Sequence, residues 1–306
     1  MDIASLNKKL GIGTELGFKE IAAGIIAIEV DTAMATASIS LMGGQVLTWH
    51  PKSQKEPILW VSKLAQYLPG KAIRGGVPVC WPWFGAHPSD RHLPGHGFAR
   101  VVPWEVTSTN IDASGVVEVE LILAESDVVT KVRPSDWTSS VVLSAHIRIG
   151  EKLEVSLTTT NNSDREIMIT EGLHTYFHVS DIENVRVLGL DDCEYVDLTD
   201  ENQRRQQVGP IIFEGELGRI FVNCDKTSVI EDSKLGRAIY VSGVGSQSIA
   251  VWNPWIETAS KIPDLGDEGW RSMVCVETAN ALENAILIQP GQHHTTTAIY
   301  SVTAYG

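Results

Sequence analysis

Apolar and polar residues alternate along much of this chain with the period of two that is typical of half-buried β-strands. In the stretch VVEVELILAE, Val117, Val119 and Leu121 share one face of the predicted strand, and glutamates occupy the other face. Similar stretches, rich in β-branched and aromatic residues, lie at residues 140–150, 152–160, 166–170, 248–253, 273–277 and 294–302. The pattern predicts a chain built mainly from β-strands.

Turn-forming residues separate the predicted strands, as at residues 42–44 and 290–291. Convincing amphipathic helices are few, and the wholly polar stretch 202–207, NQRRQQ, is expected to be a loop. The chain contains no internal repeat, no low-complexity tract and no linker that would divide it. These features predict an all-β protein, a large sandwich of antiparallel sheets that forms a single domain over residues 1–306.

The balance of charges narrows the range of partners. The 306 residues are 43% hydrophobic and 20% charged, which is typical of a globular protein, and the formal net charge is −14. Such an acidic chain is expected to bind neither nucleic acid nor an anionic membrane, and no apolar run approaches the length of a membrane span. An anionic small molecule would therefore need a local pocket of positive side chains.

The cysteines and the N-terminus bear on the cellular compartment. The four cysteines are scattered and form no C-x-x-C pair; they are Cys80, Cys193, Cys224 and Cys275. The N-terminal sequence MDIASLNKKLGIG lacks the apolar core of a signal peptide. Together these features predict reduced thiols and a cytoplasmic location.

Two arginines flank an unusually aromatic stretch. Arg74 lies in AIRGGVPVCWPWFG, residues 72–85, and Arg100 ends GHGFAR, residues 95–100. Bulky aromatic side chains favour burial, whereas a guanidinium group stays charged and resists it unless an anion meets it. The two arginines are therefore either paired with carboxylates of the chain itself or available to an anionic ligand.

Three further residues are candidates for a site, each with a structural alternative. His174 lies in the apolar and aromatic stretch EGLHTYFHV, where a lone histidine is more often a hydrogen-bonded core residue. Glu277 follows an apolar run in VCVE, a costly place for an acid unless it is paired, solvated or functional. Trp252 in VWNPW would serve either core packing or contact with the apolar face of a sugar.

Other chemistries receive little support from the sequence. His87, His92 and His96 are close in the chain, but the segment between the last two contains Pro and Gly and no paired carboxylate motif, so the signal for a metal site is weak. The chain has neither a Walker lysine after its Arg-Gly-Gly nor a G-x-S-x-G nucleophile elbow.

Several of these stretches occur together in one known family. AIRGGVPVCWPWFG, HGFAR, LHTYF, VWNPW and VCVE, in this order, resemble the hexose-6-phosphate mutarotase branch of the aldose 1-epimerase family. The resemblance runs from about residue 25 to the C-terminal strand and leaves residues 1–23 as an N-terminal extension. It implies the galactose-mutarotase-like β-supersandwich of antiparallel sheets.

The resemblance also implies an activity, the interconversion of the α and β anomers of a hexose 6-phosphate, typically glucose 6-phosphate. His174 would be the acid at the ring oxygen and Glu277 the base at the anomeric hydroxyl. His96 would hydrogen-bond near the reacting oxygens, and Arg74 and Arg100 would bind the phosphate. Neither a metal nor an organic cofactor is expected, and we expect a monomer.

The sequence departs from the family at two positions and leaves other classes open. Relatives often carry a larger polar residue where this chain has Gly95, and an aspartate that contacts substrate where it has Gly218. A sugar-phosphate sensor without catalytic activity would keep the arginines but need neither the acid nor the base. A free-sugar aldose 1-epimerase would not need the arginines, and a glycosidase or lyase would want paired carboxylates, which are not identifiable.

Overall fold

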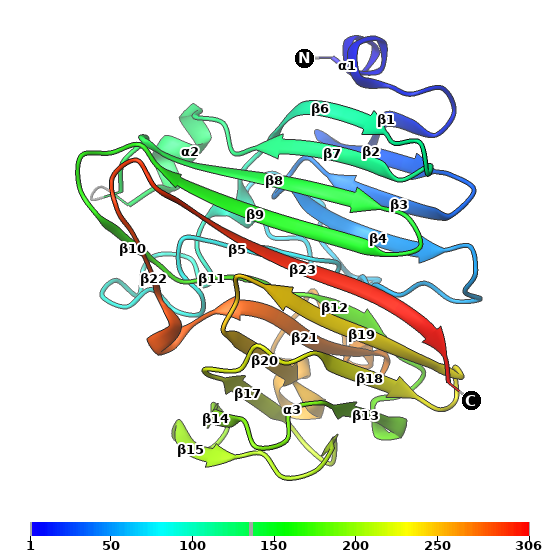
Figure 1. Ribbon diagram of the computed structural model, residues 1–306, viewed down its shortest axis with the longest axis vertical. Coiled ribbons are helices and arrows are strands. Elements are labelled where there is room, and N and C mark those ends of the chain that lie inside the picture. The colour runs from blue at the N-terminus through cyan, green and yellow to red at the C-terminus, as the bar shows by residue number, and fades with distance from the viewer. Residues whose placement is uncertain (1, 135–136, 306) are drawn as a thin grey trace.

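The computed structural model describes residues 2–134 and 137–305, which form mainly antiparallel β-sheets (Figure 1). The predicted all-β architecture with few helices is therefore confirmed. The largest sheet of the described residues has the order β16 (Ile211–Ile212), β13 (Val185–Leu188), β18 (Ser228–Asp232), β19 (Arg237–Val244), β23 (His293–Ala304), β9 (Leu153–Asn161), β8 (Val141–Ile149), β7 (Val117–Ile122) and β6 (Glu105–Ile111).

A second large sheet carries the candidate site. Its order is β15 (Gln203–Gln206), β14 (Glu194–Asp197), β17 (Leu217–Phe221), β20 (Ser248–Asn253), β21 (Met273–Asn280), β11 (Glu171–Leu173) and β5 (Val79–Cys80), and β12 (Tyr176–His178) also pairs with β21. Strand β21 packs against β19 and β23 of the largest sheet, and all eight of its residues are buried. A carboxylate on this strand is therefore placed in the interior.

Two smaller sheets complete the β-structure of the described residues. One consists of β1 (Leu16–Ala22), β2 (Ile25–Asp31), β3 (Ala35–Ser40) and β4 (Gln45–Pro51), and the other pairs β10 (Ile167–Ile169) with β22 (Ile286–Ile288). The α-helices are α1 (Ile3–Leu10), α2 (Asp127–Val132) and α3 (Trp255–Ser260). Short 3₁₀ helices span Ala99–Val101, Ile182–Asn184, Gly269–Ser272 and Leu282–Asn284. The N-terminal residues are part of this structure, because α1 buries Leu6 and Leu10 in the core and β1 pairs with β2.

The alternating sequence pattern is realised directly in the long strands. In β8 and β9 every second residue is buried, as expected for strands with one face on the core. The indole rings of the aromatic stretch belong to this core: Trp81 and Trp83 are buried, and Trp81 Nε1 donates to Thr159 Oγ1 at 2.9 Å. These two aromatic side chains are thus buried, as bulky aromatic residues favour.

Two expectations from the sequence are wrong. Residues 203–206 of the polar stretch form strand β15 at the edge of its sheet, where a strand exposed on both faces shows no apolar period. The cysteines are not all free thiols, because Cys193 and Cys224 form a disulfide with Cα atoms 6.0 Å apart. Neighbouring strands β14 and β17 bring these two cysteines together across 31 residues of sequence, which no local motif reveals. Cys80 and Cys275 are free and buried.

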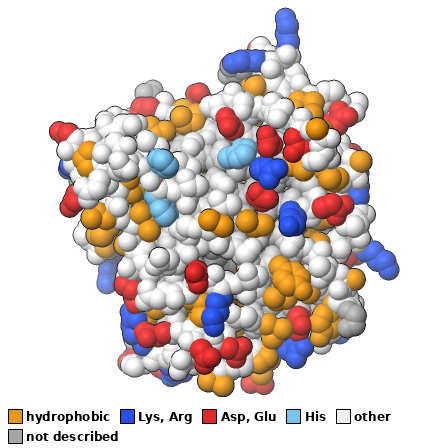
Figure 2. All heavy atoms as spheres, in the orientation of Figure 1, with side chains coloured by type: hydrophobic (Ala, Val, Ile, Leu, Met, Phe, Trp, Pro, Cys, Tyr) orange, Lys and Arg blue, Asp and Glu red, His pale blue; other side chains and the backbone are white. Residues whose placement is uncertain are grey.

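Within the described residues, no helix has the length and apolarity needed to cross a membrane. Acidic and basic side chains are interspersed over the face shown in Figure 2, which has the orientation of Figure 1. On this face the acidic side chains are therefore not gathered in one patch.

A buried polar cluster joins the two large sheets. Glu171 on β11 is fully buried; its Oε1 accepts from Thr296 Oγ1 at 2.6 Å and from Asn280 Nδ2 at 3.4 Å, and its Oε2 has no partner. The nearby His294 has its pKa lowered by burial, so it offers no fixed positive charge. Burial, opposed by these hydrogen bonds, raises the pKa of Glu171 to about 7.

This cluster predicts a dependence of stability on pH. Because the folded pKa of Glu171 lies above the usual 4.5, its contribution is complete below pH 4.5 and is lost as the pH rises through about 7. We expect the free energy of unfolding of the wild type to fall between pH 5 and 8, by up to about 3 kcal/mol relative to Glu171→Gln. Urea unfolding across this pH range measures the difference. Parallel curves for the two proteins would contradict it.

Candidate active site

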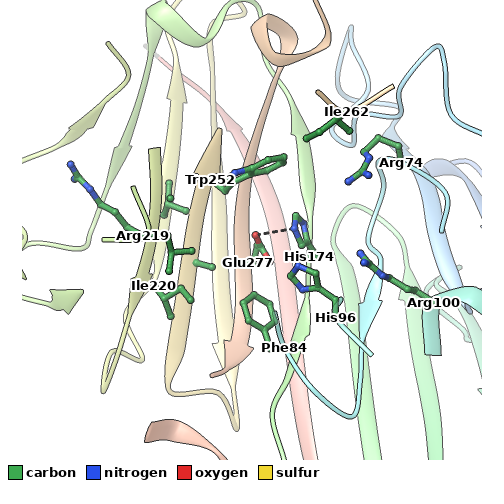
Figure 3. Close-up of a pocket in the computed structure, with 14 residues that line it drawn as sticks. Arg74, Phe84, His96, Arg100, His174, Arg219, Ile220, Trp252, Ile262 and Glu277 are labelled. Carbon is green, nitrogen blue, oxygen red and sulfur yellow. Dashed lines mark ion pairs between the residues drawn. The ribbon is translucent and has the colours of Figure 1, made fainter. Parts of the chain in front are cut away.

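A pocket of about 270 Å³ opens over the second large sheet (Figure 3). All six site residues predicted from the sequence line it: Arg74, His96, Arg100, His174, Trp252 and Glu277. The other lining residues are Phe84, Leu198, Gly218, Arg219, Ile220, Ala250, Val251 and Ile262. Segments separated by up to about 200 residues of sequence therefore converge on one cavity.

Neighbouring strands position the two residues of the proposed acid–base pair. Glu277 lies on β21, and the connection between β11 and β12 carries His174, whose backbone N–H donates to Pro78 O at 3.0 Å. His174 Nε2 lies 3.5 Å from Glu277 Oε1, and both side chains are buried. The other polar atoms of the pair, His174 Nδ1 and Glu277 Oε2, have no hydrogen-bond partner among the described residues.

Burial controls where the protons of this pair lie. It raises the pKa of Glu277 well above its usual range, against the opposing charge of Arg100. It lowers the pKa of His174 well below its usual range, and nearby histidine and arginine side chains lower it further. A neighbouring carboxylate by itself favours a charged imidazole, but desolvation of His174 outweighs that attraction here. Burial favours a neutral imidazole beside a protonated carboxyl group.

His96 stands in the pocket as a neutral hydrogen-bond donor. Its Nδ1 accepts from the backbone N–H of Gly85 at 3.2 Å, which leaves the proton on Nε2. Burial, followed by the charges of Arg100 and Arg74, lowers the pKa of His96 to about 3. Its ring meets that of His174 edge-on, with centroids 5.2 Å apart.

Glycines set the path of the backbone on both sides of the arginines. Gly76 has φ +63°, and a Cβ there would lie 2.2 Å from Val46 O. Gly97 has φ +72°, and a Cβ there would lie 1.9 Å from Trp81 O. The conformation and the close approach both require glycine. These two glycines lie close to Arg74 and Arg100 in sequence, and both arginines line the same cavity.

The structure separates the two alternatives that the sequence left open for the arginines. Arg74 is paired with a carboxylate of the chain: its Nε and NH2 atoms each lie 3.2 Å from Asp264 Oδ1. Arg100 donates to Gly95 O at 2.7 Å, but it forms no ion pair with any described residue, and its buried Nε has no partner. Figure 3 shows both guanidinium groups on the same side of the pocket. Arg100 is therefore available to an anion.

An aromatic side chain connects Arg74 with His174. Arg74 NH1 donates to Tyr176 Oη at 3.0 Å, and the tyrosine ring stacks on the imidazole with centroids 4.9 Å apart and an angle of 15°. Trp252 meets both rings edge-on, at 5.9 Å from His174 and 6.3 Å from Tyr176. The position of the imidazole thus depends on the arginine side of the pocket.

Sequence reasoning missed several residues of this arrangement. Tyr176 lies in the LHTYF motif, and its place two residues after His174 could have singled it out. Asp264 follows α3 in a loop and pairs with an arginine 190 residues away, which no local signal reveals. A Cβ at Gly218 would lie 3.3 Å from Leu198 Cβ, so Leu198 occupies the side of the pocket where an aspartate side chain was expected in relatives.

The histidines that the sequence raised as metal ligands do not gather. Among the described residues, neither His87 nor His92 lies in a group of three potential ligands, and the one such group consists of His174, Cys275 and Glu277. Cys275 is fully buried.

With this geometry in place, comparison with known proteins shows the family. A profile of the aldose 1-epimerase family matches residues 27–301. The chain belongs to the aldose 1-epimerase family. A relative from Escherichia coli, named "Putative glucose-6-phosphate 1-epimerase", is 39% identical over 256 residues, which cover 84% of this chain and 83% of the relative.

Solved structures of other proteins share the fold of this aldose 1-epimerase family member. The crystal structure of a "putative mutarotase" from Salmonella typhimurium has a TM-score of 0.88 and 30% identity, and covers 96% of each chain. A galactose mutarotase-like protein from Clostridium acetobutylicum is 16% identical and has a TM-score of 0.68. The match covers 95% of this chain and 100% of the other. The expected galactose-mutarotase-like fold is therefore confirmed.

Proposed function

We propose that this aldose 1-epimerase family member interconverts the α and β anomers of a hexose 6-phosphate, with glucose 6-phosphate as the first candidate. The observation that carries the proposal is Arg100, an arginine without a carboxylate partner, beside a buried histidine–glutamate pair in one pocket. The name of the Escherichia coli relative supports the same substrate. A sugar with an anionic group fits both features at once.

The acid–base pair supplies the two proton transfers that ring opening needs. Glu277 as carboxylate takes the proton of the anomeric hydroxyl, while His174 as imidazolium gives a proton to the ring oxygen, and the C1–O5 bond breaks to leave the open aldehyde. Rotation about C1–C2 presents the other face of the carbonyl group. The reverse transfers then close the ring as the other anomer and restore both side chains.

The two protonation forms of this pair correspond to the two ends of the opening step. After opening, the imidazole is neutral and the carboxyl is protonated, which is the form that burial favours in the free pocket. Arg74 and Arg100 are among the groups that lower the pKa of His174. A phosphate dianion at these arginines offsets their charge and so favours the imidazolium form that the opening step requires.

The remaining pocket residues serve binding in this proposal. Arg74 and Arg100 hold the phosphate, for which the planar guanidinium fork provides matched donors. Trp252 offers an apolar face to the sugar ring, and the Nε2–H of His96 donates to an oxygen near the reacting centre. Gly218 contributes no hydroxyl-binding side chain, so the discrimination between hexoses rests on the other walls.

Exchange spectroscopy by NMR on the anomers of glucose 6-phosphate tests the proposal. Spontaneous mutarotation sets the baseline, and we expect the protein to accelerate exchange of glucose 6-phosphate and to act much more weakly on glucose. A chelator should not lower the rate, because neither proton transfer requires a metal. Saturable binding of glucose 6-phosphate without acceleration would contradict catalysis and indicate a sensor.

A further inference from the structure

A buried thiol that the proposed reaction does not use lies next to His174 and Glu277. The ligand atoms of His174, Cys275 and Glu277 all lie within 4.8 Å of one another, and all three residues are buried. Cys275 and Glu277 are two residues apart on β21 and so project from the same face of the strand. His174 approaches from the connection between β11 and β12. The fold thus places an imidazole, a thiol and a carboxyl group around a single point.

The spacing of these atoms is close to that of a tetrahedral zinc site. Bond lengths of about 2.0–2.3 Å from zinc to nitrogen, oxygen and sulfur place pairs of ligand atoms about 3.3–3.7 Å apart. His174 Nε2 and Glu277 Oε1 are already 3.5 Å apart. Because the thiol sulfur lies within 4.8 Å of both, its distance to each must shorten by at most about 1.3 Å to complete the set.

Two further observations point to a ligand at this place. Glu277 Oε2, the second oxygen of the carboxyl group, is buried and has no hydrogen-bond partner among the described residues, and an ion bound through both carboxylate oxygens would give it one. His174 and Glu277 also line the pocket, so an ion can enter from it and keep a fourth position open toward it. A structural zinc site has four protein ligands and no open position, so the site here would differ from that type.

The neighbouring arginines do not exclude a cation. Binding of a divalent ion to a thiolate and a carboxylate releases the two protons that those groups carry, so the net charge of the site stays the same. Arg74 moreover has Asp264 as its own counter-ion. A thiolate ligand selects zinc and similarly soft ions over magnesium and calcium, which prefer oxygen ligands.

We propose that His174, Cys275 and Glu277 bind Zn²⁺ or a similarly thiophilic divalent cation, and that this ion inhibits the enzyme. The inhibition rests on the proposed function, because the ion occupies the two side chains that would transfer protons. The binding does not rest on it. Zinc here is an inhibitor that competes with substrate, and its removal restores activity.

Cobalt titration of the metal-free protein tests the site directly. We expect one equivalent of Co²⁺ to produce a thiolate-to-cobalt charge-transfer band in the wild type and in Cys80→Ser, which removes the other buried free thiol. Cys275→Ser and Cys275→Ala should lack the band and bind Zn²⁺ at least about tenfold more weakly. Near-ultraviolet circular dichroism checks that each variant is folded. A full band in both Cys275 variants, or its absence in the wild type, would overturn the proposal.

Anomer exchange with added Zn²⁺ provides the second readout. The wild type and Cys80→Ser should be inhibited, with full recovery on chelation, whereas Cys275→Ser should keep its exchange rate and need at least about tenfold more zinc. If the cobalt band forms but no protein accelerates exchange, the proposed function fails and the metal site stands. If exchange is accelerated and no cobalt band forms, the metal site fails and the proposed function stands.

Discussion

Replacing Glu277 by glutamine is expected to lower the anomer exchange of glucose 6-phosphate by on the order of 10²–10⁴-fold, and His174→Ala by a similar factor. Glutamine keeps the size of the side chain but cannot take up the hydroxyl proton. Alanine at position 174 removes the proton donor to the ring oxygen. Each variant thus removes one of the two coupled transfers. Exchange spectroscopy on saturating substrate measures the loss as a change in kcat.

Folding and binding should survive these changes. The long strands of the core do not depend on either side chain, and the arginines that are proposed to hold the phosphate remain in place. Glu171→Gln provides a matched control, because Glu171 is also a buried glutamate of the same sheet but lies outside the pocket. We expect this control to keep its exchange rate. Rates near wild type for both Glu277→Gln and His174→Ala would contradict the acid–base assignment and favour a sensor.

Replacing Arg100 by alanine is expected to lower kcat/KM for glucose 6-phosphate by roughly 10- to 100-fold. A charge-assisted hydrogen bond to a buried partner contributes about 1.5–3 kcal/mol, which corresponds to that range. Exchange of free glucose should barely change, because glucose has no phosphate. Added inorganic phosphate should compete with substrate in the wild type and much less in the variant. Lysine at this position should restore the loss in part, since it returns the charge without the planar fork.

The two arginines should differ in a way that the structure explains. Arg74→Ala should cause a similar loss for the phosphorylated sugar, but it also leaves Asp264 without its ion-pair partner and removes the hydrogen bond to Tyr176. We therefore expect a fall in kcat and in stability as well, which makes Arg100 the cleaner test.

Arg219 supplies a control that carries the same charge. It lines the pocket, but its side chain donates to Gln207 at 2.7 Å and lies over the ring of Tyr195, and Figure 3 shows it directed away from the cavity. Arg219→Ala should keep the preference for the phosphorylated sugar. Equal losses for glucose 6-phosphate and glucose in Arg100→Ala would show that Arg100 maintains the fold, and the phosphate assignment would fall.

The sequence by itself determined many of the strands and six of the residues that line the pocket. Alternation with period two is a local property of a strand with one buried face, so β7, β8, β9 and β23 could be predicted from it. Glu277 stood out because an acid next to an apolar run is costly wherever the chain folds. The six predicted residues could be named from the sequence because their motifs resemble those of one family, and all six line the same cavity.

Only the tertiary structure decided how these residues are paired and charged. Arg74 is paired with Asp264, whereas Arg100 has no carboxylate partner among the described residues. Cys193 forms a disulfide with Cys224, which lies near it only in the folded chain. Edge strand β15 has no apolar pattern, because neither of its faces is buried. The pKa values of the site depend on desolvation by all surrounding segments. Ion pairing and desolvation both depend on residues that are distant in sequence, so a local sequence pattern cannot reveal either of them.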